Sequence, residues 1–100
     1  MLREILTENP GDAFARYGLA MEYSNAGDTD AALAEFRSLL DRHPDYTAGY
    51  FMAAQTLARA ERKDEAKTML NTGIASAQRT SNRQAQSEMQ AMLDELELDY

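Results

Sequence analysis

Few residues of this chain could take part in catalysis. His43 is the only histidine and cysteine is absent, so a histidine-assisted nucleophile would have to be assembled around one imidazole. His43 stands between Arg42 and Pro44, where a helix is expected to end and a cation is favourable beside the helix dipole. A structural role accounts for this histidine, and we expect no catalytic residues and no enzymatic activity.

Metal and cofactor motifs are also missing from the sequence. Asp28-Thr29-Asp30 resembles a fragment of an acidic metal loop, but a calcium loop needs further oxygen ligands and a glutamate about a dozen residues from its start. Zinc would require grouped carboxylates, because one histidine and no cysteine cannot supply its ligands. Neither G-x-G-x-x-G nor G-x4-G-K-[S/T] occurs. We expect no metal and no cofactor.

Composition and charge narrow the classes of partner. The chain has 100 residues, 44% of them hydrophobic, with a net charge of −7. An acidic surface repels phosphate backbones, so we expect no nucleic-acid partner. No apolar run approaches the roughly 20 residues of a membrane span, and the first residues lack a signal-peptide core. We expect a cytoplasmic protein that does not enter membranes.

The spacing of apolar residues predicts helices along the whole chain. Apolar residues recur at intervals of three and four, and no stretch alternates as a strand would. The predicted helices cover about residues 13–25, 29–42, 46–60, 63–77 and 82–97, after a short opening turn at 2–7. Asp12 and Asp28 are the predicted N-caps of the first two. The connections of about three to five residues require neighbouring helices to run antiparallel.

The chain also matches itself in residue type when it is shifted by 34 positions. The matching sets are Pro10 and Pro44, Ala20 and Ala54, Ala32 and Ala66, and the apolar series Leu2, Phe36 and Leu70. They fall on small residues where two helices would touch, on the apolar ridge, and on the prolines between units. Their position therefore indicates a repeated pair of helices.

This pattern resembles the tetratricopeptide repeat family, whose 34-residue unit carries the signature W-x2-L-G-x2-Y…A-x3-F…P. The first unit reads Arg16, Leu19, Ala20, Tyr23, Ala32, Phe36 and Pro44. The second reads Tyr50, Ala53, Ala54, Leu57, Ala66 and Leu70. Three positions depart from the pattern. Arg16 replaces the signature aromatic residue, Glu61 stands where the first unit has Gly27, and Gly73 is expected to interrupt the fourth long helix.

The resemblance implies an all-α fold of antiparallel helix–turn–helix repeats, a short α-solenoid like those of small bacterial members of the family. Residues 1–100 would form one domain. Within it we expect a partial leading unit at 1–10, repeats at 11–44 and 45–78, and a capping helix at 81–98 that docks on the fourth long helix. The side chains expected to be buried are Ala20, Tyr23, Ala32, Phe36, Ala54, Ala66 and Leu70.

One stripe of side chains lies off the packing ridge and defines the candidate binding site. Its members are Phe14, Tyr17, Met21, Asn25, Phe51, Gln55 and Arg59, with Ala48 beside them. The resemblance places them on the concave side, where apolar rings offer contact area and Arg59 a cation for a partner carboxylate. We expect folding to depend little on these rings. The alternative is that they pack against the closing helix or neighbouring loops.

The resemblance further implies a protein–protein interaction module, an adaptor or scaffold that binds a peptide or helix in a concave groove. Some members of the family grip C-terminal carboxylates with lysine and asparagine. Tyr17, Met21, Phe51 and Gln55 stand at such places here, so we do not expect that clamp. The alternative function is structural: a repeat protein that self-associates through its end faces. The expected state is a monomer or a weak homodimer with a partner that the sequence does not identify.

Overall fold

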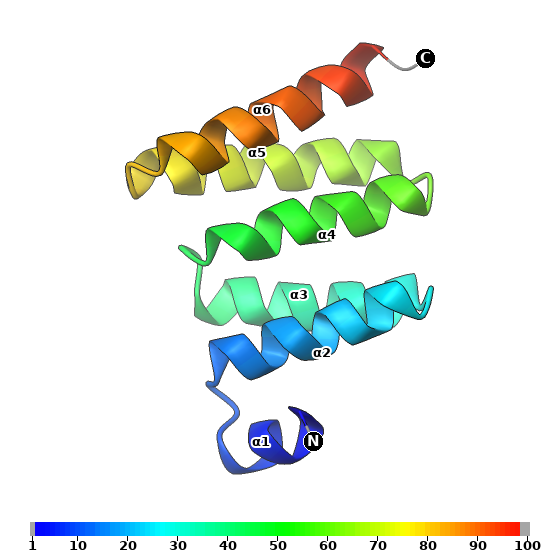
Figure 1. Cartoon of the computed structure of the whole chain (residues 1–100), viewed down its shortest axis with the longest axis vertical. Coiled ribbons are helices and arrows are strands. Elements are labelled where there is room, and N and C mark those ends of the chain that lie inside the picture. Colours follow the sequence, from blue (N-terminus) through cyan, green and yellow to red (C-terminus); the bar gives the residue numbers. More distant parts are fainter. Residues whose placement is uncertain (1, 99–100) are drawn as a thin grey trace.

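The computed structural model describes residues 2–98, which fold into six consecutive helices stacked along the long axis of the molecule (Figure 1). The helices are α1 (Leu2–Glu8), α2 (Ala13–Asn25), α3 (Thr29–Arg42), α4 (Thr47–Arg59), α5 (Lys63–Arg79) and α6 (Arg83–Leu98). No strand occurs within this part of the chain. The all-α prediction is confirmed. The main difference in length is α5, which continues to Arg79 instead of ending near residue 77.

The helices form two layers. In Figure 1, α2, α4 and α6 lie in front, and α3 and α5 lie behind them. Each long helix packs chiefly against its neighbours in sequence, and α2 and α6 also touch α4. The molecule is consequently a narrow slab, with extents of 43 × 31 × 17 Å.

Helix ends follow the predicted capping chemistry. A carboxylate oxygen of Asp12 accepts a hydrogen bond from the Ala15 amide at 2.9 Å, and Asp28 accepts one from Ala31 at 3.2 Å. Both predicted N-caps are therefore confirmed. Asn82 gives α6 the same kind of cap, because its side-chain oxygen accepts from the amide of Ala85 at 3.1 Å.

The turns after α2 and α4 have the same backbone shape despite different residues. Gly27 has φ 81° and Glu61, 34 positions later, has φ 60°. Glycine adopts this left-handed conformation without steric cost, whereas a residue with a Cβ atom is disfavoured there. The departure from the repeat pattern at Glu61 thus leaves the turn unchanged in form.

The small residues predicted at the helix contacts are buried. Ala20, Ala32, Ala54 and Ala66 are fully covered, as are Phe36 and Leu70. The prediction is wrong for Tyr23, which is only half-buried. The ring packs against the edge of the apolar cluster that Leu6 of α1 forms with Ala15 and Leu19. Arg3 also contacts it, with its guanidinium carbon 5.4 Å from the ring centre and a hydrogen bond to the Tyr23 hydroxyl.

Arg16 stands where the repeat signature has an aromatic residue, and it makes the same kind of hydrogen bond as Tyr50, the aromatic residue at this position in the next unit. Its guanidinium donates to the carbonyl oxygen of Pro10 at 3.1 Å. Tyr50, 34 positions later, donates its hydroxyl to the carbonyl of Pro44 at 2.7 Å. Arg16 additionally forms an ion pair with Glu35 of α3 at 2.7 Å. The two residues therefore fasten corresponding loops in successive units by different chemistry.

Gly73 does not interrupt its helix, contrary to the prediction. It is buried in the middle of α5, where a Cβ atom would stand 2.6 Å from the Cβ of Tyr50 and 2.6 Å from the sulfur of Met89. The missing side chain lets α5 approach α4 and α6 closely. The glycine is thus a packing residue at the junction of three helices.

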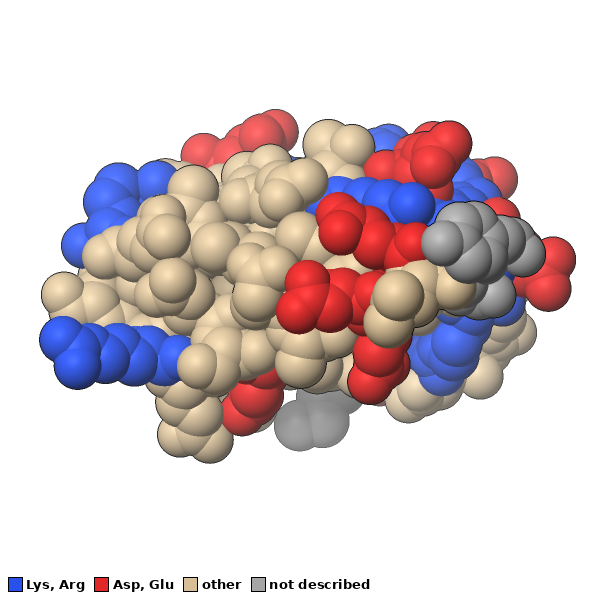
Figure 2. Space-filling model, turned by 90° about the horizontal axis from the view of Figure 1, so that it is seen from above, with Lys and Arg blue, Asp and Glu red and all other residues tan. Residues whose placement is uncertain are grey.

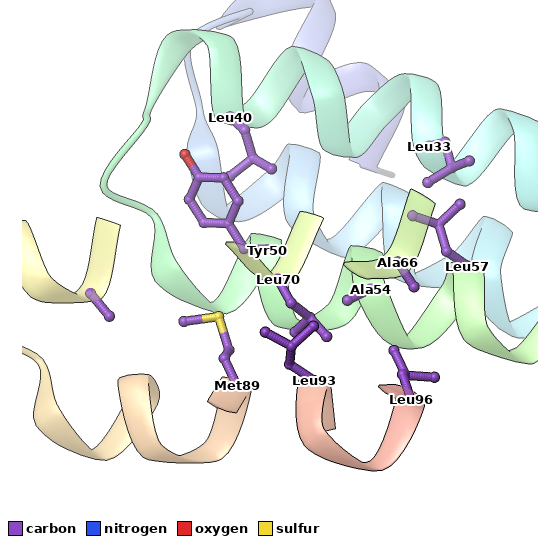
Figure 3. Packing of buried hydrophobic residues seen from close by; sticks show 11 residues of the cluster. Leu33, Leu40, Tyr50, Ala54, Leu57, Ala66, Leu70, Met89, Leu93 and Leu96 are labelled. Atoms are coloured by element: carbon purple, nitrogen blue, oxygen red, sulfur yellow. The ribbon is translucent and has the colours of Figure 1, made fainter. Parts of the chain in front are cut away.

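The last helix closes this junction. Met89, Leu93 and Leu96 of α6 are buried in the main apolar cluster with residues of α3, α4 and α5 (Figure 3). Most of the contacts of α6 are with α5. The predicted docking of the last helix on the fourth long helix is confirmed.

We predict that Gly73→Ala lowers the free energy of unfolding by about 1–3 kcal/mol, because the added methyl group overpacks against the rigid Cβ of Tyr50. This would occur although alanine favours a helix by about 1 kcal/mol over glycine. The measurement is chemical denaturation. Asn71→Ala, at an exposed position of the same helix, is the control and should be neutral or stabilising. A Gly73→Ala protein as stable as the parent would contradict the close approach.

Candidate functional site

An open hollow of about 280 Å³ lies between α2, α4 and the beginning of α6. Its lining residues are Tyr17, Thr47, Ala48, Phe51, Met52, Asn82, Gln84, Ala85, Glu88 and Met89. We call this space the inner hollow. Six of these ten side chains are apolar or aromatic, and Glu88 is the only charged one among them. The hollow can accept an apolar group while amide and carboxylate groups at its edge accept or donate hydrogen bonds.

Two of the seven predicted site residues line the inner hollow. They are Tyr17 of α2 and Phe51 of α4, and Ala48 lines the hollow as well. The other five lie outside its lining. The prediction also missed the wall that α6 contributes. Shifting Phe51 by one 34-residue period leads to Ala85, and that signal in the sequence could have located this wall.

Tyr17 is fixed in place by two other rings. Its ring meets Phe36 edge-on with centroids 6.4 Å apart and lies 5.5 Å from the ring of Tyr46. Burial, and secondarily the nearby Tyr46, raises the pKa of the Tyr17 hydroxyl, so it stays protonated at neutral pH. Met21 packs against the same cluster and Phe51 against the main one. Because Tyr17 packs against these core rings, we now expect folding to depend on it more than the sequence predicted.

Arg59 stabilises the contact between α2 and α4 through a hydrogen bond. Its guanidinium donates to the Ser24 hydroxyl at 2.6 Å, and Ser24 lies 2.7 Å from the hydroxyl of Thr56. Thr56 donates its proton to the carbonyl oxygen of Met52 at 2.8 Å, which leaves Ser24 to donate to Thr56. Ser24 and Thr56 are buried. The chain of hydrogen bonds satisfies both hydroxyls and holds Arg59 away from the inner hollow.

The remaining predicted residues have no common role. Phe14 is 76% exposed near the start of α2, Asn25 is exposed at its end, and Gln55 is half-buried on α4. Phe14 is the most exposed large apolar side chain of the described residues. These positions extend the same helix layer on either side of the inner hollow without shaping it.

No cluster of three or more potential metal ligands occurs within residues 2–98. None of the helices in that range is long and apolar enough to cross a membrane. The arrangement that remains is a hollow between helices of a repeat array.

Comparison with known proteins identifies that array. A profile described as tetratricopeptide repeat matches residues 23–93, most of the chain. The chain belongs to the tetratricopeptide repeat family. A repeat-containing protein of this family from Pseudomonas aeruginosa is 27% identical over 96 residues, which is 96% of this chain and 91% of that protein.

Solved tetratricopeptide repeat structures share the fold. The solution structure of a tetratricopeptide repeat domain protein from Salinibacter ruber is 30% identical and superposes with a TM-score of 0.84, covering 92% of this chain and 93% of that one. The type III secretion translocator chaperone SycD of Yersinia enterocolitica superposes with a TM-score of 0.85 at 16% identity, over 97% of this chain and 68% of SycD. At that identity, the likeness to SycD is one of fold alone.

We predict that Tyr17→Ala costs about 2 kcal/mol of stability, less than the roughly 3–5 kcal/mol of a fully buried aromatic residue, because the ring is only half-buried. Phe14→Ala should change stability by less than about 0.5 kcal/mol, because its ring is mostly exposed. Thermal and denaturant unfolding of the two variants measure the difference. Equal stabilities would show that Tyr17 does not support the core.

Proposed function

We propose that this tetratricopeptide repeat protein is a binding module whose inner hollow receives a short segment of another protein. The observation that carries the proposal is the set of half-buried apolar side chains around an open space. Phe51 and Met52 are only partly covered although they stand at the centre of the array. Covering them with a partner would remove apolar surface from water, the main source of affinity in such contacts.

The size and polarity of the inner hollow define what it would hold. Its volume of about 280 Å³ lies just below the roughly 300–1,000 Å³ of sites for whole small ligands. One or two apolar side chains of a peptide or helix fit this space better than a cofactor. Gln84 and Glu88 are hydrogen-bonded to each other at 3.1 Å on one edge, where they could pair with the backbone of the segment.

We further infer that residues 11–44 and 45–78 are the two repeats, that 1–10 form a partial leading unit, and that α6, within 81–98, caps the array. The outward side of α6 supports this division because most of the residues along it are polar: Arg83, Gln86, Ser87, Gln90 and Asp94, with Ala91 among them. Seen from that end, acidic side chains gather toward the C-terminal half of α6 and much of the remainder is uncharged (Figure 2). Such a surface offers a further repeat little apolar area.

The outward side of α6 also argues against the alternative function, in which the protein is a structural repeat. In that alternative, copies of the protein would associate through their end faces. We predict a monomer in sedimentation velocity from micromolar to millimolar concentrations, because a polar, acidic face gives stacked copies little to bury. A sedimentation coefficient that rises with concentration would favour the homodimer. Substituting Gln90→Glu, which adds charge to that face, should then lower the association, whereas a monomer would be unaffected.

The binding proposal can be tested by photo-crosslinking in the cells that make the protein. We predict that a photoreactive residue at Gln84, on the edge of the inner hollow, captures a defined partner. The same residue at Ser87, which is also exposed but lies on the outward side of α6, should capture little. The products are identified by mass spectrometry.

A blocking substitution supplies the control. Ala48→Trp should fill the hollow and abolish the crosslink from Gln84, because Ala48 is an exposed lining residue whose replacement leaves the core intact. Ala34→Trp, at an exposed alanine of α3, should have no effect. Equal capture from Gln84 and Ser87, or a crosslink that survives Ala48→Trp, would contradict the proposal.

A further inference from the structure

A second open space lies in the other layer of the array. α3 and α5 each pack against α4, but within residues 2–98 the backbones of α3 and α5 do not come close to one another. A furrow of about 470 Å³ remains between them, larger than the inner hollow. It involves none of the residues that line the inner hollow. We call it the α3–α5 furrow.

The floor of the furrow is apolar and has no unsatisfied polar group. Leu40, Tyr50 and Leu57 form it, and all three are buried in the main cluster. The ring of Tyr50 lies beside Leu40 between α3 and α4 (Figure 3). The Tyr50 hydroxyl donates to the Pro44 carbonyl, so it needs no hydrogen-bond acceptor from a ligand. Met69, half-buried, adds an adaptable side chain at the α5 edge.

The rims of the furrow are acidic. Asp41 stands on α3, Asp64 and Glu65 stand on α5, and Arg37 is the one cation among the lining residues of the described chain. Glu65 is bound by Arg62 at 2.6 Å, and this hydrogen bond lowers the pKa of its carboxyl group. Asp41 and Asp64 are exposed, and neither forms an ion pair within residues 2–98. Two carboxylates on opposite rims are thus open to a cationic partner.

The length of the furrow suits a helix. Asp64, Thr68 and Thr72 line it at intervals of four residues, so they follow one face of α5 for about 12 Å. The hydroxyls of Thr68 and Thr72 donate to carbonyl oxygens of α5 itself. This wall consequently offers few hydrogen-bond donors to an extended backbone, whereas a helix satisfies its own backbone and needs none.

We propose that the α3–α5 furrow binds a basic amphipathic helix of a partner protein, with apolar side chains over Leu40 and Met69 and lysine or arginine beside Asp41 and Asp64. A helix laid in a groove presents side chains at positions i, i+3, i+4 and i+7, which matches about two turns along this wall. The furrow and the inner hollow would give the protein two separate binding surfaces.

The test is an NMR titration of the whole protein with a four-turn synthetic helix that has leucine on one face and lysine on the other. The methyl signals of Leu40 and Met69 should shift saturably. The same peptide with glutamate in place of lysine should not bind. Ala48→Trp should leave the titration unchanged, so this result does not depend on the fate of the inner hollow.

Matched variants separate the furrow from general attraction between opposite charges. Asp41→Asn with Asp64→Asn should weaken binding about fivefold, because each substitution removes one exposed ion pair and exposed pairs contribute little to binding. Asp94→Asn with Glu97→Gln removes the same charge from α6 and should leave the affinity unchanged. Equal weakening in both variants, shifts confined to the inner hollow, or no saturable binding would overturn the proposal.

Discussion

The rest of the structure depends on the close approach of antiparallel helices at residues with almost no side chain. Ala20, Ala32, Ala54 and Ala66 are fully buried, and Gly73 allows α5 to reach both α4 and α6. Helix surfaces pack at short range only where small residues leave room for the ridges of the neighbour. Each close pair fixes the angle of one helical hairpin, and the next hairpin must then stack beside it in two layers.

The two candidate binding surfaces follow from this layered stacking. Helices of one layer pack mainly against helices of the other layer and make few or no direct contacts with one another, so each layer keeps an open space between its own members. The inner hollow has aromatic walls and one carboxylate, Glu88. The α3–α5 furrow has an apolar floor and acidic rims at Asp41 and Asp64. The difference in charge predicts different partners for the two faces.

Polar interactions tie the units together without repeating the same residues. Arg16 and Tyr50 occupy equivalent positions and donate to equivalent proline carbonyls, although one is a cation and the other a phenol. Arg59 reaches across to Ser24 and completes a buried chain of hydrogen bonds that ends at the backbone. Within residues 2–98, no buried side-chain polar atom lacks a partner. Successive units therefore keep the same helix arrangement, although different side chains form the polar interactions that hold it.

The sequence by itself determined the helices, the N-caps Asp12 and Asp28, the repeat and the alanines of the helix contacts, because periodicity, capping and small-residue spacing act over a few residues or one fixed interval. Of the inner hollow it predicted Tyr17 and Phe51, with Ala48 beside them, and it missed the wall formed by α6, since that wall depends on how a helix from another part of the chain is placed. The half-exposure of Tyr23, the packing role of Gly73 and the binding of Arg59 to Ser24 were likewise decided by tertiary structure. In each case a neighbouring helix forms the environment of the residue, and the local sequence pattern does not specify which side chains of that helix will face it.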